Sequence, residues 1–218
     1  MKNNIVFFLA IVLVCNAGSS FCQQPTGKQE RLRSFGIKGG LNFINIAQAQ
    51  SINGSNRSGF MAGVFYSPYT NKLLGWGTEL IYSRQGYNFK TNTTTGVVKL
   101  NYILVPLLNT FNITRYFQLY LGGQIGILLH LKVDSSSGPS GNPAAPQNPA
   151  DYFNNIDWGF ICGIQIHPGR RLMLGGRLNA NAGSINKMQN AGIFPSYIPG
   201  DSKELKSNVM QFYIGYYL

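Results

Sequence analysis

The feature that most constrains the fold is an alternating stretch that runs from Lys99 to Lys132. Two apolar segments, KLNYILVPLLNTF and YFQLYLGGQIGILLHLK, flank the short polar link NITR. In both segments apolar side chains recur at every second position, which is the period of a β-strand and not of an α-helix. The tight link predicts an antiparallel hairpin. Each predicted strand has about 12 residues or more, enough for the 9–11 residues with which a tilted strand crosses a bilayer.

The rest of the chain repeats this pattern and gives eight predicted strands in total. They are expected at 34–44, 59–67, 73–89, 99–111, 116–132, 157–166, 172–183 and 207–218. Polar segments separate some of them, at about 45–58, 90–96, 133–155 and 184–206, and alternate with short turns near Tyr69, Asn112 and Pro168. An even strand number with alternating long and short connections is typical of bacterial outer-membrane barrels, whose long loops face outside and whose tight turns face the periplasm.

The composition favours a membrane barrel over a soluble one. Charged residues make up 11% of the chain, against about 25% in ordinary soluble domains. A soluble barrel with an apolar cavity also alternates its faces, but its outer face would carry many charged side chains. Mean hydropathy is −0.04, and no interior run reaches the roughly 18 apolar residues of a membrane helix. The sequence therefore predicts an all-β, eight-stranded antiparallel transmembrane β-barrel of up-and-down topology.

Aromatic residues near the predicted strand ends would form the girdles that mark membrane interfaces. They are Phe35, Tyr66, Tyr82, Phe89, Phe117, Trp158, Phe212 and Tyr216.

The N-terminus predicts export. Lys2 precedes an apolar run over residues 5–14, and small and polar residues follow, which is the three-part pattern of a secretory signal peptide. We expect a signal peptide at 1–22, a periplasmic leader at 23–33 and a barrel at 34–218, in the outer membrane of a Gram-negative cell. Cys162 would then be the one cysteine left, so no intramolecular disulfide can form. We expect it to be a small apolar residue that is buried or faces lipid.

The candidate site is a cluster of polar side chains on the lumen side of the strands. Its members are Lys38, Glu79, Gln124, Asp157 and Arg177. An eight-stranded barrel is just wide enough for side chains to fill, and an ionised group inside it must find a partner. We expect these residues to form a structural polar plug, with a proton or ion path as the alternative. Lys99 is also expected to face the lumen.

Catalytic, metal and cofactor chemistry is sparse. The two histidines, His130 and His167, have no nucleophile motif nearby, whereas hydrolysis needs a nucleophile, a base and an orienting acid. No helix follows the glycines that could otherwise bind phosphate, and these more plausibly let strands bend. They are Gly36, Gly39, Gly40, Gly122, Gly123 and Gly126. We expect no enzymatic activity, no catalytic residue, no metal and no cofactor.

The net charge of +11 points to anionic lipid rather than nucleic acid, because the basic residues are scattered and form no binding motif. Outer-membrane lipids, including lipopolysaccharide phosphates, are the expected partners. The cations concerned are Lys90, Lys99, Lys132, Lys187, Lys203 and Lys206. The barrel-assembly machinery is a second expected partner, because the last strand ends on an apolar row. An envelope protein that binds the long loops is a third.

Several motifs resemble the PorT-like outer-membrane β-barrel family of Bacteroidetes. They are FGIKGGLNF, TELIYSRQGY, LNYILVPLL, YFQLYLGGQIGILL and DWGFICGIQI. The resemblance covers nearly all of the mature chain and implies an eight-stranded outer-membrane barrel without a reaction. We expect a structural or interaction role through long extracellular loops, with a plugged lumen. The alternatives are a PorT-like accessory role in type IX protein secretion and a narrow transport pore.

Overall fold

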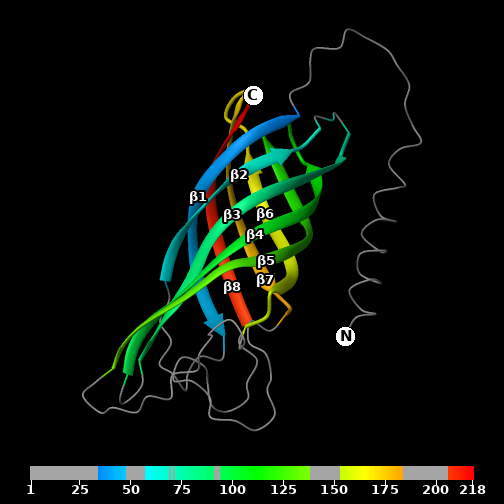
Figure 1. Cartoon of the computed structure of the whole chain (residues 1–218). Coiled ribbons are helices and arrows are strands. Elements are labelled where there is room, and N and C mark those ends of the chain that lie inside the picture. The colour runs from blue at the N-terminus through cyan, green and yellow to red at the C-terminus, as the bar shows by residue number, and fades with distance from the viewer. Residues whose placement is uncertain are drawn as a thin grey trace.

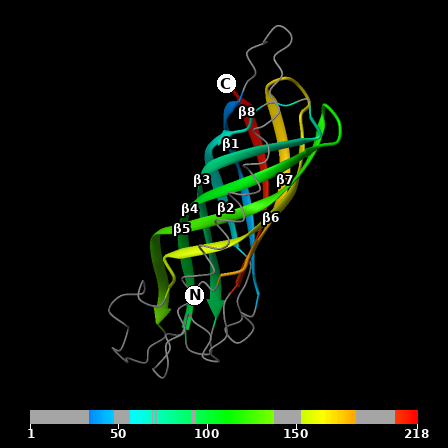
Figure 2. The same cartoon turned by 90° about the vertical axis from the view of Figure 1, so that its right-hand side faces the viewer.

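The chain forms one closed β-barrel, seen from two sides in Figures 1 and 2. The computed structural model describes residues 34–47, 57–68, 70, 72–90, 94–137, 153–183 and 206–218. The strands are β1 (Phe35–Ala47), β2 (Arg57–Tyr66), β3 (Leu74–Lys90), β4 (Thr94–Asn112), β5 (Phe117–Ser137), β6 (Ile156–Ile166), β7 (Leu172–Asn181) and β8 (Lys206–Tyr217). Each pairs antiparallel with its neighbours in chain order. The predicted eight-stranded antiparallel barrel is confirmed.

Pairing between β1 and β8 closes the ring. Their register runs from Gly36 opposite Tyr217 to Ala47 opposite Lys206, and the Leu218 amide donates to the Phe35 carbonyl at 3.0 Å. The start of β1 and the end of β8 therefore lie at the same end of the barrel (Figure 1). No helix among the described residues is long and apolar enough to cross a membrane.

The outer surface of the barrel is apolar. All eight strands contribute large exposed hydrophobic side chains, far beyond the apolar patches that soluble monomers expose. The predicted lipid-facing row of the last strand is confirmed, since these side chains are exposed: Met210, Phe212, Ile214, Tyr216 and Leu218. Cys162 is exposed on this surface too. Most of the predicted girdle aromatics are exposed or half-buried, but Phe89 is only 1% exposed and lies inside.

Strand β4 turns its most regular apolar row inward. Leu100, Tyr102, Leu104 and Leu108 are buried in the interior, while Leu107 of the opposite row is exposed. A two-residue period places alternate side chains on opposite faces but does not say which face is inside. Lys99 belongs to the outward row with its side chain 29% exposed, so the expectation that it faces the lumen is wrong.

Strands β3, β4 and β5 extend beyond the barrel wall. They have 17, 19 and 21 residues, against 10 in β2 and in β7. The ladder with β2 ends at Ser83 of β3 and the ladder with β6 ends at Ile127 of β5, and beyond these residues the three strands continue to pair with one another. We call residues 84–90, 94–101 and 128–137 the extension; it reaches toward the lower left of Figure 1.

The extension corrects the predicted loops. Residues 90 and 94–96 belong to strands, which leaves only 91–93 as the connection between β3 and β4. Residues 133–137 continue β5, and residues 45–47 continue β1. The remaining parts of the predicted loops, at 48–56, 138–152 and 184–205, lie outside the described residues. Residues 153–155, the end of the third predicted loop, are described. The predicted signal peptide and leader, at 1–33, also lie outside them.

An apolar layer covers the inner face of the extension. Tyr87 and Phe89 of β3 and Val98 of β4 are each at most 1% exposed. Phe153, just before β6, is 0% exposed and belongs to the same cluster, against which Val133 packs. Burying each such side chain contributes about 1.5–3 kcal/mol, and the cluster continues into the barrel interior through residues such as Tyr102 and Leu104.

A β-bulge in β5 reverses the face that its side chains occupy. Tyr102 lies opposite Leu128 and Asn101 opposite His130, so Leu129 is an extra residue in the ladder. Beyond it, His130 is exposed and Leu131 packs against the interior cluster. The sequence pattern had placed these two residues on the opposite faces, because an alternation counted through the bulge is wrong by one residue.

Deleting Leu129 is expected to leave the barrel folded, because it turns the bulge into a regular ladder with every other pair intact. Deleting Leu121, an exposed residue inside the regular ladder, is the matched control. It forces Tyr120 or Gln124 toward lipid and is expected to abolish folding. Heat-modifiable gel mobility after refolding into lipid distinguishes them. Equal folding of the two deletion variants would contradict the assignment of the bulge.

Candidate functional site in the barrel lumen

Three ionisable side chains meet in the middle of the barrel. Glu79 of β3 accepts a hydrogen bond from Lys38 Nζ of β1 at 2.5 Å and one from Arg177 Nη1 of β7 at 2.7 Å. All three residues are at least 92% buried, with exposed fractions of 4%, 8% and 2% for Lys38, Glu79 and Arg177. Each carboxylate oxygen thus has a cationic donor, which is the condition under which a buried ion pair offsets its desolvation cost.

The Glu79 to Arg177 contact joins opposite walls. In a closed ring of eight strands, β3 and β7 are four strands apart in either direction. A direct hydrogen bond of 2.7 Å between them therefore crosses the whole lumen at this level. Lys38 Nζ also lies 4.1 Å from the centre of the Tyr213 ring. This cation–π contact connects β8 to the cluster as well.

An amide chain continues from this centre toward β3. Arg177 Nε donates to Gln211 Oε1 at 2.5 Å, and Gln211 Nε2 donates to Asn42 Oδ1 at 2.6 Å. Asn42 Nδ2 then lies within 2.9 Å of Ser83 Oγ. Asn179 Nδ2 also donates to Gln211, at 3.0 Å. These contacts link β7, β8, β1 and β3 into one network, which fixes the side-chain positions across the lumen.

A second polar layer lies toward the short turns of the barrel. The Tyr120 and Tyr213 hydroxyls are 2.9 Å apart, and Tyr213 donates to Gln165 Oε1 at 3.0 Å. Two glycines make room for the phenol rings: a Cβ on Gly163 would lie 2.6 Å from the Tyr120 ring, and one on Gly175 would overlap the Tyr213 ring. The absent side chains are therefore what allows two tyrosines to cross a narrow lumen.

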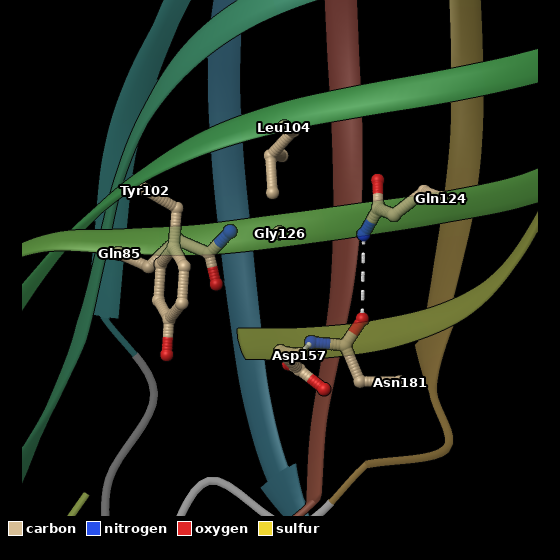
Figure 3. A pocket seen from close by; sticks show the side chains of 7 residues that line it. All are labelled: Gln85, Tyr102, Leu104, Gln124, Gly126, Asp157 and Asn181. Atoms are coloured by element: carbon tan, nitrogen blue, oxygen red, sulfur yellow. Dashed lines mark hydrogen bonds between the residues drawn. The ribbon is translucent and has the colours of Figure 1, made fainter. Parts of the chain in front are cut away.

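Asp157 lies in a separate polar pocket near the start of β6, shown in Figure 3. Its carboxylate accepts from Asn181 Nδ2 at 2.5 Å and from the Trp158 amide at 2.8 Å. Gln124 reaches Asn181 Oδ1 at 3.4 Å, the dashed line in Figure 3. The space enclosed by these residues is too small for a water molecule.

The five candidate residues thus fall into two groups. Lys38, Glu79 and Arg177 are in mutual contact through Glu79, and Gln124 and Asp157 meet through Asn181. Sequence reasoning missed the neutral members of the network. They are Asn42, Ser83, Tyr120, Gln165, Asn179, Asn181, Gln211 and Tyr213. Their spacing could have found several of them, because Asn42 and Ser83 follow Lys38 and Glu79 by four residues and so share their faces.

A third polar group lies on the outside of the extension. Asp134 accepts from Lys99 Nζ at 2.6 Å, and Lys132 Nζ lies 3.3 Å from its other oxygen. The hydrogen bonds from Lys99 and Lys132 lower the pKa of the Asp134 carboxyl. Since the group is solvated, these ion pairs contribute little stability, but they hold two cations on one surface.

The two histidines lie in different parts of the barrel. His130 is exposed on the extension, and His167 lies in the β6–β7 turn, where burial lowers the pKa of its imidazole. Among the described residues no group of three or more His, Cys, Asp or Glu side chains could hold a metal ion.

We expect Glu79→Gln to destabilise the barrel by about 3–5 kcal/mol, because Lys38 and Arg177 would remain buried without their carboxylate. Lys38→Met is the matched comparison. It should reduce the free energy of unfolding by less, because the remaining Glu79–Arg177 ion pair has no net charge. Denaturant unfolding in lipid vesicles measures both. A larger loss from Lys38→Met would show that the carboxylate is not the centre of the network.

Comparisons with known proteins give one family match. Residues 21–185 match the sequence profile of the family described as "Outer membrane protein beta-barrel domain". No curated protein matches the chain.

Several solved structures are similar at low sequence identity. Ail, the attachment invasion locus protein of Yersinia pestis, is 15% identical with a TM-score of 0.46, over 86% of this chain and 99% of that one. Neisserial surface protein A is 13% identical with a TM-score of 0.48, over 84% and 97% of the two chains. OprG of Pseudomonas aeruginosa is 15% identical with a TM-score of 0.43, over 86% and 96%.

Proposed function

Because this chain belongs to the outer membrane protein beta-barrel domain family, we propose that it is an interaction barrel that presents a cationic sheet to the phosphates of lipopolysaccharide. The protein lies in the outer membrane. The observation that carries the proposal is the extension, because three long strands project from one end of a barrel whose lumen is crossed by side chains.

The orientation follows from the connections. The turns at 113–116 and 167–171 are short and lie at the end where β1 begins and β8 finishes. At the other end the connection at 91–93 is also short, but those at 48–56, 138–155 and 182–205 are longer. Outer-membrane barrels have their short turns in the periplasm, so the extension at the other end is extracellular. The interaction surface then lies next to the lipopolysaccharide leaflet.

Basic residues gather on the outer face of the extension. Lys99 lies opposite Lys132 on the neighbouring strand, and Arg84 lies opposite Asn101, two residues further along β4. Asp134 is the one acidic residue among the described residues of the extension. With the exposed Lys90, four cations against one carboxylate leave this face positive. Each cation near an anionic lipid surface contributes about 1 kcal/mol.

The lumen supports an interaction role over a pore. An open channel needs a continuous path along the axis, whereas the Glu79–Arg177 and Tyr120–Tyr213 hydrogen bonds cross it at two levels. We propose the polar cluster as a structural plug for this reason. The transport pore stays the alternative, and the envelope protein partner and the PorT-like role in type IX secretion stay predictions from the sequence.

Reversing two charges tests the surface. Lys99→Glu with Lys132→Glu is expected to weaken binding of the nanodisc-embedded protein to purified lipopolysaccharide by at least about tenfold at low salt. Asp134→Asn is expected to have the opposite effect, because it removes the one acidic group that binds both lysines. Lys72→Glu, in the β2–β3 turn at the other rim, is the control. Unchanged binding in the double variant, or an equal loss with Lys72→Glu, would contradict the proposal.

Planar-bilayer recording tests the plug. The wild-type protein is expected to show no large, stable unitary conductance, because side chains cross the lumen. The variant Tyr120→Ala with Tyr213→Ala removes one of the two levels and is expected to stay closed at the other. A large, stable conductance of the wild-type protein would favour the pore.

A further inference from the structure

An apolar groove of about 520 Å³ crosses the outside of the barrel over β6, β7, β8 and β1. The groove is deepest where two outward-facing residues, Gly39 of β1 and Gly176 of β7, have no side chain. They lie on the two sides of β8, because Gly39 is opposite Ile214 and Gly176 is opposite Phe212. Larger side chains, among them Leu41, Ile164 and Leu174, form its walls.

The groove is open space and not a packing defect. A Cβ on Gly39 would have one neighbour within 4 Å, the Met61 carbonyl oxygen at 3.7 Å. A Cβ on Gly176 would come no nearer than 3.4 Å to the Phe212 ring. By contrast, most described glycines would overlap a backbone or a ring if they carried a Cβ. These two positions could therefore hold a larger side chain without strain, yet the fold leaves them empty.

The β6–β7 turn, at the periplasmic end of two strands that border this groove, carries two arginines. Arg170 and Arg171 are exposed in the β6–β7 turn. Arg171 Nη1 donates to the Tyr216 hydroxyl at 2.9 Å, which holds the guanidinium over the outer row of β8. The outward neighbour of Tyr216 in that row is Ile214, a wall of the groove about 7 Å further along the strand.

Within the part of the chain that the structure describes, no carboxylate neutralises the charge of this turn. Among the described residues neither arginine forms an ion pair with a carboxylate. Arginine binds phosphate through paired N–H donors, and the periplasmic leaflet of an outer membrane consists of phospholipid. The arginine pair thus lies at the level of the phosphates, with the apolar groove leading from it into the hydrocarbon.

We propose that this groove binds one anionic phospholipid of the periplasmic leaflet. The phosphate lies on Arg170 and Arg171, and an acyl chain fills the space over Gly39 and Gly176. A groove of this volume falls within the range of roughly 300–1,000 Å³ that is usual for ligand sites. The site is distinct from the extension, which lies at the opposite end of the barrel.

Native mass spectrometry of the full-length protein tests the site, with phosphatidylglycerol as the probe and phosphatidylcholine as the neutral reference. The wild-type protein is expected to retain one phosphatidylglycerol in preference to phosphatidylcholine. Arg170→Gln with Arg171→Gln should reduce that preference about tenfold. Lys72→Gln, a cation of the same rim on the far side of the ring, should not change it.

Substitutions that fill the groove test the proposed acyl-chain site separately from the arginines. Gly39→Leu with Gly176→Leu should abolish retention of both lipids while leaving heat-modifiable folding intact. Ala180→Leu, an exposed position of β7 outside the groove, is the control. Wild-type retention in either double variant would overturn the proposal. So would a change from dimer to monomer in sedimentation of the filled variant without any change in lipid retention, because a second copy would then occupy the groove.

Discussion

Backbone hydrogen bonding is the constraint on which this structure depends. In hydrocarbon each unpaired amide or carbonyl costs several kcal/mol, so a sheet that spans the membrane must have no free edge. The β1–β8 pairing, from Gly36 opposite Tyr217 to Ala47 opposite Lys206, removes both edges at once. Closure forces one row of each strand toward lipid and the other into a narrow lumen. The apolar outer surface and an interior filled by both polar and apolar side chains are therefore two consequences of the same ring.

Closure buries polar side chains in the lumen, where hydrogen-bond partners must replace water. Glu79 accepts hydrogen bonds from Lys38 and Arg177, and Arg177 also donates one to Gln211. Such a network gains little stability over an apolar core, because desolvation offsets the attraction. It does fix a single arrangement of the walls, since each partner comes from a different strand. Because side chains fill the lumen, molecules can bind only to outer surfaces of the described part of the barrel, and the extension is one of these surfaces.

The extension and the apolar groove show how one barrel can present two different surfaces. At the end that carries the extension, the bulge at Leu129 moves His130 outward and Leu131 inward. The extension thereby gains an apolar inner face under Phe153 and a cationic outer face. Toward the opposite end, glycine in place of larger side chains opens an apolar groove over strands that include β6 and β7, whose connecting turn carries Arg170 and Arg171. Both surfaces come from small local departures from a regular strand pattern.

The sequence alone determined the strand period, the number of strands and the apolar row that ends at Leu218, because these depend on neighbours in the chain. It also identified Lys38, Glu79 and Arg177 as lumen residues. Only the tertiary structure decided that the regular row of β4 faces inward, that Phe89 and Leu131 are interior, and that Lys99 is outside. It also decided which lumen side chains meet. Glu79 and Arg177 are 98 residues apart, and their contact depends on the register and stagger of the whole ring, to which no local pattern is sensitive.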